Sequence, residues 1–273
     1  MESGVESAME KKVIHTENGD LYYWVGGNQS IDAKCIVFVH GMTTDHSMFD
    51  KQVDHFSNEF KIITLDLPLH GKSRHYTNFT FSNIVDVLKN ILALENISKV
   101  ILVGQSLGGY VCQEFGVRYP ERVKSFVGID TTPFGHYYYP RWERFILSKI
   151  GLLSSFFPYK TLTKSISKGA TRTDYAFDNM YSSVSKLSKD EIINIMNLGY
   201  KELLKRTETV HFTFPVLLVI GEKDNTGNVK KYNNKWATQS GYQLVVISDA
   251  AHNSNVDNYN EFNKVLADFL DLM

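Results

Sequence analysis

The sequence is poor in cysteine and contains no long hydrophobic run. Its 273 residues include only two cysteines, Cys35 and Cys112, each within an apolar stretch. We therefore expect two buried free thiols rather than a disulfide framework, as is usual in a reducing cytoplasm. No stretch approaches the roughly 18 apolar residues that cross a bilayer, and residues 1–12 lack the apolar centre of a secretory signal. These absences favour a cytoplasmic globular protein.

An excess of charge of one sign is also missing, since the formal net charge is -1. A nucleic-acid-binding surface needs clustered Lys and Arg, and no amphipathic basic segment stands out as a membrane anchor. We expect neither nucleic-acid binding nor stable membrane association. The cysteines and histidines lack the spacing of a zinc site, and no glycine-rich phosphate loop follows a strand. We therefore expect no metal and no organic cofactor, and the sequence carries no signal for an oligomeric state.

What the chain does contain is an alternation of short apolar runs with longer helical patterns. The runs are rich in Val and Ile and lack polar alternation, which predicts strands buried on both faces of a parallel sheet. They cover residues 35–39, 61–65, 100–103, 123–129, 216–220 and 244–247. A β-hairpin is predicted before them, where residues 12–16 and 21–25 flank an Asn-Gly turn. Apolar residues recur at helical spacing over 81–92 and 259–269. This alternation predicts a doubly wound, mostly parallel α/β sheet.

The alternation breaks between residues 134 and 214, where no buried strand is evident. Helical patterns cover residues 142–150 and 189–206 of this segment, and aromatic residues crowd it. We predict a core domain formed by residues 1–133 and 215–273, with a helical cap, residues 134–214, inserted into it. Candidates for lining a substrate pocket are Tyr138, Trp142, Phe145 and Tyr181. The alternative is that these aromatic side chains pack the insertion onto the core.

The strongest local motif is GQSLGG at residues 104–109. It follows the strand predicted at 100–103 and opens a helical pattern over 107–119, the setting of a nucleophile elbow. A sharp turn from strand to helix strains the serine backbone, and side chains at Gly104 and Gly108 would clash. The turn exposes the Ser106 hydroxyl at a helix N-terminus. We predict that Ser106 is a nucleophile.

A serine nucleophile needs a base, and the position of His252 singles it out among nine histidines. It follows the last predicted strand, and loops after parallel strands gather at one edge of the sheet, where Ser106 also lies. Asp224 follows the strand at 216–220 and is our candidate for orienting the imidazole, because the order Ser, Asp, His suits this fold. Asp130 ends the strand at 123–129 on the same edge and is the alternative. We interpret Glu222 and Asp249 as solvated loop carboxylates.

An acyl transfer also needs hydrogen-bond donors for the developing oxyanion. The segment His40-Gly41-Met42 follows the strand at 35–39, and its glycine lets the loop backbone approach the nucleophile. We predict that the oxyanion hole consists of the Met42 and Leu107 N–H groups. His40 is interpreted as a structural residue of the loop.

Together these motifs resemble the α/β-hydrolase superfamily. The matching segments are residues 40–42 (HGM), 66–73 (DLPLHGKS), 104–109 (GQSLGG), 221–224 (GEKD) and 251–252 (AH). The resemblance covers residues 35–130 and 215–272, whereas the segment between them resembles only the family's variable cap. It implies the α/β-hydrolase fold with a helical cap insertion and a Ser-Asp-His triad. It also implies that the 66–73 loop is structural, so Asp66, His70 and Ser73 receive no chemical role.

Two departures from the family pattern stand out. Leu69 occupies the place of the commonest loop glycine, and no hydrophobic-Pro ending follows Asp224. Ser106 also argues against haloalkane dehalogenases and epoxide hydrolases of this fold, which use aspartate there.

The predicted function is cleavage of a small-to-medium carboxylic ester through an acyl-enzyme on Ser106. The same triad could serve a C–C bond hydrolase or an aminopeptidase, the latter if acidic side chains grip an amino group. The alternative from another class is a non-catalytic receptor or binding protein on the same fold.

Overall fold

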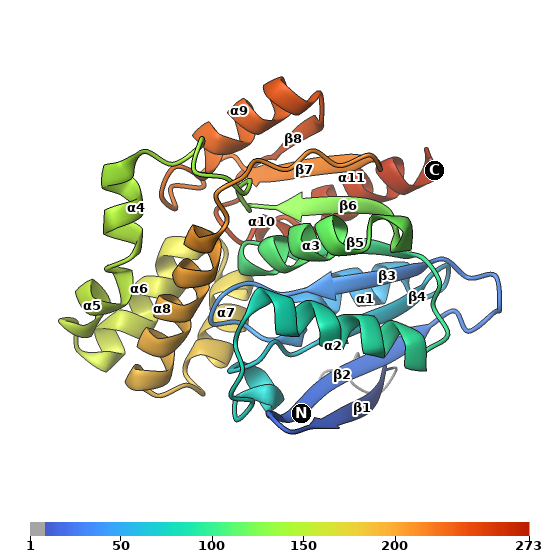
Figure 1. Cartoon of the computed structure of the whole chain (residues 1–273), viewed down its shortest axis with the longest axis horizontal. Helices are drawn as coiled ribbons and strands as arrows, with labels where there is room; N and C mark the ends of the chain where they lie inside the picture. The colour runs from blue at the N-terminus through green and yellow to red at the C-terminus, as the bar shows by residue number, and fades with distance from the viewer. Residues whose placement is uncertain (1–8, 273) are drawn as a thin grey trace.

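The computed structural model describes residues 9–272 and contains one eight-stranded sheet between layers of helices (Figure 1). The strands follow the order β1-β2-β4-β3-β5-β6-β7-β8 across the sheet. Their bounds are β1 Met9–Thr16, β2 Gly19–Gly27, β3 Cys35–Val39, β4 Lys61–Leu65, β5 Val100–Gln105, β6 Val123–Ile129, β7 Val216–Gly221 and β8 Gln243–Ile247. The hairpin β1–β2 joins antiparallel to β4, and the other strands run parallel. The predicted sheet and hairpin are confirmed.

Alternate side chains of the central strands pack into two hydrophobic layers. On β3, Val37 and Val39 belong to the layer under α2, α3 and α9, whereas Ile36 and Phe38 belong to the layer under α1 and α11. Burial on both faces explains why these strands read as continuous apolar runs. The bounds of these helices are α1 Asp50–Phe56, α2 Phe81–Leu94, α3 Leu107–Arg118, α9 Val229–Ser240 and α11 Tyr259–Asp271.

Five helices lie between β6 and β7, at one end of the sheet (Figure 1). We call this segment the cap. Its helices are α4 Arg141–Leu147, α5 Ile150–Ser155, α6 Tyr159–Ala170, α7 Asp174–Val184 and α8 Lys189–Lys205. A capping box starts α8, because Ser188 Oγ accepts from the Glu191 N–H and the Glu191 carboxylate accepts from the Ser188 N–H. The short α10, Ser254–Asp257, precedes α11.

The helix predicted over residues 142–150 is two helices. The chain breaks after Leu147 and resumes as α5 at Ile150. A side chain at Gly151 would overlap Asn197 of α8, so this glycine lets α5 pack closely against α8. Close packing between cap helices therefore overrides the single helical period in this part of the sequence.

Leu69 adopts the left-handed backbone region, with φ 68°. Glycine favours this region, so a leucine here carries backbone strain. The Leu69 side chain packs against both the main core and a hydrophobic cluster of the cap. The loop thus accepts the substitution and gains a contact with the cap.

Within residues 9–272, no helix combines the length and apolar character needed to cross a membrane.

Candidate active site

Ser106 lies at the sharp turn between β5 and α3, with φ 47° and ψ -110°. Such a conformation costs about 1–3 kcal/mol and persists only where its surroundings hold it. The Ser106 N–H donates to the Ile129 carbonyl at 2.8 Å, and the Ser106 carbonyl accepts from Thr131 Oγ1 at 2.8 Å. A Cβ on Gly104 would lie 2.6 Å from the Gly108 carbonyl oxygen. The turn therefore requires glycine, as the motif predicts.

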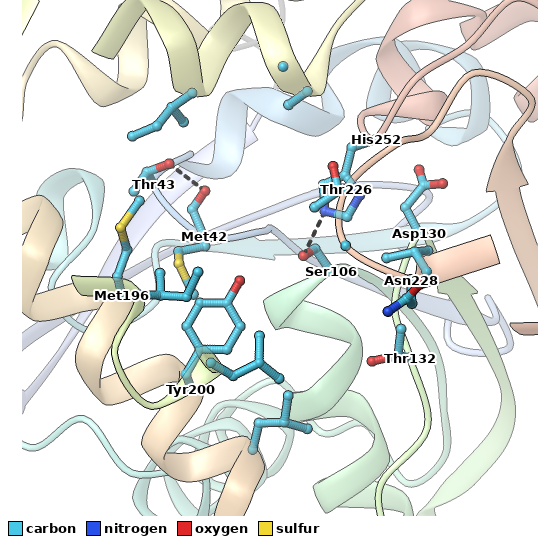
Figure 2. Close-up of a pocket in the computed structure, with 18 of the residues that line it drawn as sticks. Met42, Thr43, Ser106, Asp130, Thr132, Met196, Tyr200, Thr226, Asn228 and His252 are labelled. Atoms are coloured by element: carbon cyan, nitrogen blue, oxygen red, sulfur yellow. Dashed lines mark hydrogen bonds between the residues drawn. The ribbon is translucent and has the colours of Figure 1, made fainter. Parts of the chain in front are cut away.

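The imidazole of His252 connects Ser106 to a carboxylate. His252 Nε2 lies 3.0 Å from Ser106 Oγ, a contact drawn as a dashed line in Figure 2, and His252 Nδ1 lies 2.9 Å from Asp224 Oδ2. These side chains follow β5, β8 and β7, so their loops meet at the carboxyl edge of parallel strands. The structure thus brings together three residues that are far apart in the sequence.

Asp130 does not contact the imidazole through a hydrogen bond. Its Oδ1 accepts from the Gly221 N–H at 2.7 Å, and its Oδ2 accepts from the Ser254 N–H at 3.1 Å and the Ser254 hydroxyl at 2.6 Å. This buried carboxylate therefore links the end of β7 to the start of α10, two residues after His252. Between the two candidate acids, the contact with the ring belongs to Asp224.

The other two carboxylates of these loops are exposed. Glu222 accepts a hydrogen bond from the Asp249 N–H at 3.1 Å and pairs with Lys223 at 3.1 Å. Neither Glu222 nor Asp249 forms a hydrogen bond with His252, in agreement with their interpretation as solvated carboxylates.

Electrostatics separate the roles of the two buried aspartates. Burial opposes ionisation of Asp224, but the nearby His252 and a hydrogen bond from the Thr226 N–H hold the pKa of Asp224 below its ordinary value. Burial and the Asp224 charge together raise the pKa of Asp130. Burial lowers the pKa of His252, while the Asp224 carboxylate raises it, and the balance lies above the ordinary value. An ionised Asp224 beside the ring stabilises a protonated imidazole.

The loop after β3 lies against the turn that carries Ser106. A Cβ on Gly41 would overlap the Gln105 side chain, and one on Gly108 would overlap the Val39 carbonyl. This close approach brings the Met42 backbone, a predicted oxyanion donor, to the same edge as the Leu107 N–H. Thr43 adopts φ 62° and donates its hydroxyl proton to the Met42 carbonyl at 2.7 Å (Figure 2).

His40 has both ring nitrogens occupied within the loop. Nδ1 donates to the Gly41 carbonyl at 2.8 Å, and Nε2 accepts from the Leu67 N–H at 3.0 Å. Burial lowers the pKa of His40, which keeps the ring neutral. His40 therefore ties the loop after β3 to the loop after β4.

A cavity of about 550 Å³ opens beside Ser106 and His252, under the cap. In Figure 2, Met42, Met196 and Tyr200 lie to one side of Ser106, and Thr132 and Asn228 lie to the other. The cap adds further apolar lining, and polar side chains from α4 and α9 complete the wall. These contributions are Leu147, Ile150, Ile166, Met180 and Leu203, with Glu143 and Tyr232. The cavity therefore has an apolar side and a polar side relative to the hydroxyl.

The four aromatic residues predicted to line the pocket do not line this cavity. On α4, Trp142 and Phe145 point to solvent, being 62% and 66% exposed, because Glu143 and Leu147 occupy the inward face at i and i+4. Tyr138 is buried in the main core. Tyr181 stacks on Phe177 with ring centroids 5.5 Å apart, inside the cap. The structure therefore corrects the assignment of these four residues to the cavity, and helix phase explains why Trp142 and Phe145 face solvent.

The aromatic lining comes instead from residues that the sequence analysis passed over. Tyr110 and Tyr139 both hydrogen-bond to the Thr132 hydroxyl at the wall of the cavity. Tyr110 lies on α3 one turn after Ser106, and this spacing is the signal that could have identified it. Tyr200 and Tyr232 become lining residues only through the packing of α8 and α9.

Two polar residues outside the prediction hold the His252 loop in place. Gln105 Nε2 donates to the His252 carbonyl at 2.7 Å. Asp257 Oδ2 accepts from the Ala251 N–H at 2.9 Å, while its Oδ1 accepts from the Arg172 and Thr173 N–H groups of the cap. Gln105 could have been suspected from its place beside Ser106. Asp257 has no motif, and its role depends on contact with a distant segment.

No group of three or more His, Cys, Asp or Glu residues within residues 9–272 is arranged to hold a metal ion. Cys35 and Cys112 are buried free thiols, as predicted, and burial raises the pKa of both. The described side chains of the site supply an alcohol, an imidazole and a carboxylate.

Comparison with known proteins agrees with this fold. A family model described as "alpha/beta hydrolase fold" matches residues 34–259. The pimeloyl-[acyl-carrier protein] methyl ester esterase of Wigglesworthia glossinidia brevipalpis is 31% identical over 113 residues, which cover 41% of this chain and 41% of that protein. The chain thus spans about two fifths of the length of this relative.

Solved structures match over nearly the whole chain. A hydrolase from Pseudomonas aeruginosa PA01 has a TM-score of 0.78 at 16% identity, covering 96% of this chain and 98% of its own. The enol-lactonase from Burkholderia xenovorans LB400 has a TM-score of 0.76 at 18% identity, covering 95% and 100%. At these identities the likeness establishes the fold.

Proposed function

Because this chain belongs to the α/β-hydrolase family, we propose that it is a serine hydrolase that cleaves a small-to-medium carboxylic ester through an acyl-enzyme on Ser106. The observation that carries the proposal is the continuous chain from Ser106 Oγ to His252 Nε2 at 3.0 Å and from His252 Nδ1 to Asp224 at 2.9 Å. The similar methyl ester esterase supports ester chemistry.

In the proposed reaction, Ser106 Oγ attacks the ester carbonyl carbon while His252 Nε2 takes the hydroxyl proton. The Met42 and Leu107 N–H groups donate to the tetrahedral oxyanion. His252 then gives its proton to the leaving alcohol as the C–O bond breaks, which leaves an acyl group on Ser106. Water, deprotonated by His252, attacks this acyl group. The bond from the acyl carbon to Ser106 Oγ then breaks as His252 returns the proton to Oγ, which releases the acid and restores the serine. Asp224 stabilises the imidazolium at both stages.

The cavity suggests how the ester lies. We propose that its apolar portion occupies the side lined by Met42, Met196 and Tyr200, and that its polar portion faces Thr132 and Asn228 (Figure 2). A cavity of about 550 Å³ accommodates a small molecule, as expected for a pocket that buries most of its ligand.

Hydrolysis of p-nitrophenyl acetate and butyrate, together with labelling by a fluorophosphonate probe, tests the proposal. We expect wild-type protein to hydrolyse at least one ester and to label, and Ser106→Ala to lose both properties. Ser182→Ala is the matched control, because Ser182 is exposed on α7 and bonds only within its own helix. Wild-type protein that neither labels nor turns over any ester would favour a non-catalytic binding protein.

One observation favours aminopeptidase activity as a second candidate. Glu143 lines the cavity and is only 8% exposed. Its carboxylate accepts hydrogen bonds from Asn228 and Tyr232 and, within residues 9–272, has no cationic partner. A buried carboxylate without a counter-ion attracts a cation, such as a substrate ammonium group. Amino-acid p-nitroanilides cleaved faster with a free amine than when N-acetylated, a preference lost in Glu143→Gln, would support this candidate over a simple esterase.

A further inference from the structure

The outer face of α4 and α5 exposes a concentration of large apolar side chains. Fifteen such side chains are exposed in the described part of the chain, and nine of them fall within residues 137–159. Their exposed fractions run from 36% to 78%. Tyr137 lies against Lys235 and Gln239 of α9. We call the other eight the apolar patch: Trp142, Phe145, Ile146, Leu152, Leu153, Phe156, Phe157 and Tyr159. Single exposed apolar residues are ordinary, but so many within one short segment indicate an interaction surface.

Packing within the chain does not account for this patch. The opposite face of the same helices is already used, since Glu143, Leu147 and Ile150 line the cavity and Gly151 lies against α8. A helix with apolar residues on both faces is normally covered on both. In Figure 1, α4 and α5 stand at the end of the molecule farthest from the sheet, with no other element over their outer side.

Positively charged residues predominate in the segment that carries the patch. Residues 134–173 contain seven Lys and Arg residues but a single acid, Glu143, which faces the cavity. Arg141, Lys149, Lys160 and Lys164 are exposed. The chain as a whole has a net charge of -1, so this concentration of positive charge is local.

Aromatic and aliphatic side chains fringed by Lys and Arg are the pattern of a helix that lies in the interface of an anionic bilayer. The apolar side chains enter the boundary between headgroups and acyl chains, and the cations stay with the lipid phosphates. We infer that α4 and α5 dock this protein on an anionic lipid surface through the apolar patch. The sequence alone suggested no stable membrane association, because the patch and its cations are spread over three short helices.

Docking in this way links the lipid surface to the reaction centre. Leu147 and Ile150 sit at the junction of α4 and α5 and line the cavity beside Ser106. An ester dissolved in the bilayer would then lie close to these lining residues and could enter the cavity with little exposure to water. The inference concerns the surface itself and holds whether or not the proposed ester hydrolysis is correct.

The chain carries its own reporter of docking. Of its three tryptophans, Trp24 and Trp236 are 2% and 0% exposed, whereas Trp142 lies in the patch at 62%. We expect vesicles of phosphatidylglycerol and phosphatidylcholine to shift the Trp142 emission to the blue and to protect it from an aqueous quencher. The full chain should float with these vesicles, less so at high salt, and not with phosphatidylcholine alone.

Two pairs of variants test the apolar and the ionic contributions. Phe156→Ser/Phe157→Ser should weaken vesicle partitioning on the order of 100-fold, because two aromatic side chains no longer enter the interface. Lys160→Gln/Lys164→Gln should weaken it roughly 30-fold on anionic vesicles. The matched controls are Leu94→Ser, which removes an exposed apolar side chain from the core domain, and Lys99→Gln; both should bind as wild type.

The outcome distinguishes lipid docking from its alternatives. Hydrolysis of a soluble ester, or fluorophosphonate labelling, should stay unchanged in the patch variants and so reports their folding. No flotation and an unchanged Trp142 emission with anionic vesicles would overturn the inference. A concentration-dependent dimer that buries Trp142 without vesicles would also overturn it and assign the patch to a second copy of the chain.

Discussion

Replacing Asp224 by asparagine isolates the role of one hydrogen bond. In the native site, Asp224 Oδ1 accepts from the Thr226 N–H at 2.7 Å and Oδ2 faces His252 Nδ1 at 2.9 Å. The Thr226 N–H requires an acceptor, so the amide oxygen of the introduced asparagine should take the Oδ1 position. Its NH₂ group would then face Nδ1, which must present a lone pair.

This exchange moves the imidazole proton to the wrong nitrogen. With Nδ1 accepting, the proton sits on Nε2, where it points at Ser106 Oγ 3.0 Å away and leaves no lone pair to accept the hydroxyl proton. The same inversion in a Ser-His-Asp triad lowers kcat about 10⁴-fold, equivalent to about 5 kcal/mol of barrier. We expect kcat for p-nitrophenyl butyrate to fall by this order, with KM little changed.

Asp130→Asn is the control, because Asp130 is buried beside the same histidine without a bond to its ring. Both of its oxygens face N–H donors, so either orientation of the amide opposes two donors and should cost about 1–3 kcal/mol of stability. Its folded fraction should keep kcat within about tenfold of wild type. Urea unfolding gives the folded fraction of each variant, to which kcat is normalised. The assignment of Asp224 as the acid would be refuted if Asp130→Asn then lost more kcat than Asp224→Asn.

Two further outcomes follow from the same geometry. Neutral His252 is the active base, and its pKa lies above the ordinary value. The kcat/KM of the wild type should therefore decline as pH falls through a midpoint above about 6.5, and a midpoint below 6.5 would contradict the assignment. Asp224→Asn removes the partner that raises this pKa and should move the midpoint to lower pH. Gly108→Ala should lower the free energy of unfolding, measured by urea titration, by about 1–3 kcal/mol, because its Cβ would overlap the Val39 carbonyl. Gly169→Ala, in a helix with nothing within 4 Å of the added carbon, should instead gain about 0.5–1 kcal/mol; equal effects of the two would show that close approach at Gly108 is unimportant.

The fate of the cap aromatics illustrates a limit of composition as a guide. Trp142 and Phe145 are as apolar as Tyr110 and Tyr200, yet the first two face solvent and the last two line the cavity. The difference is the phase of each helix relative to its neighbours. A helix of about two turns, such as α4, has too few residues for its period to reveal which face is inward.

The sequence by itself determined the sheet and pointed to the side chains that gather at its edge. Strands buried on both faces, such as β3, must be apolar throughout, and the turn at Ser106 admits only glycine at positions 104 and 108. These requirements are local, so they leave a signature in consecutive residues. The convergence of Ser106, Asp224 and His252 was predicted from the rule that loops after parallel strands share one edge.

Only the tertiary structure decided which carboxylate meets the imidazole, which side chains line the cavity and where apolar surface stays uncovered. Asp130 and Asp224 follow neighbouring strands. The carboxylate of Asp130 already accepts hydrogen bonds from the Gly221 and Ser254 N–H groups, so the Asp224 carboxylate contacts the imidazole. The anchoring of the His252 loop by Asp257 likewise depends on a cap segment 85 residues away. Such contacts are set by the packing of distant elements, and no periodicity along the chain records them.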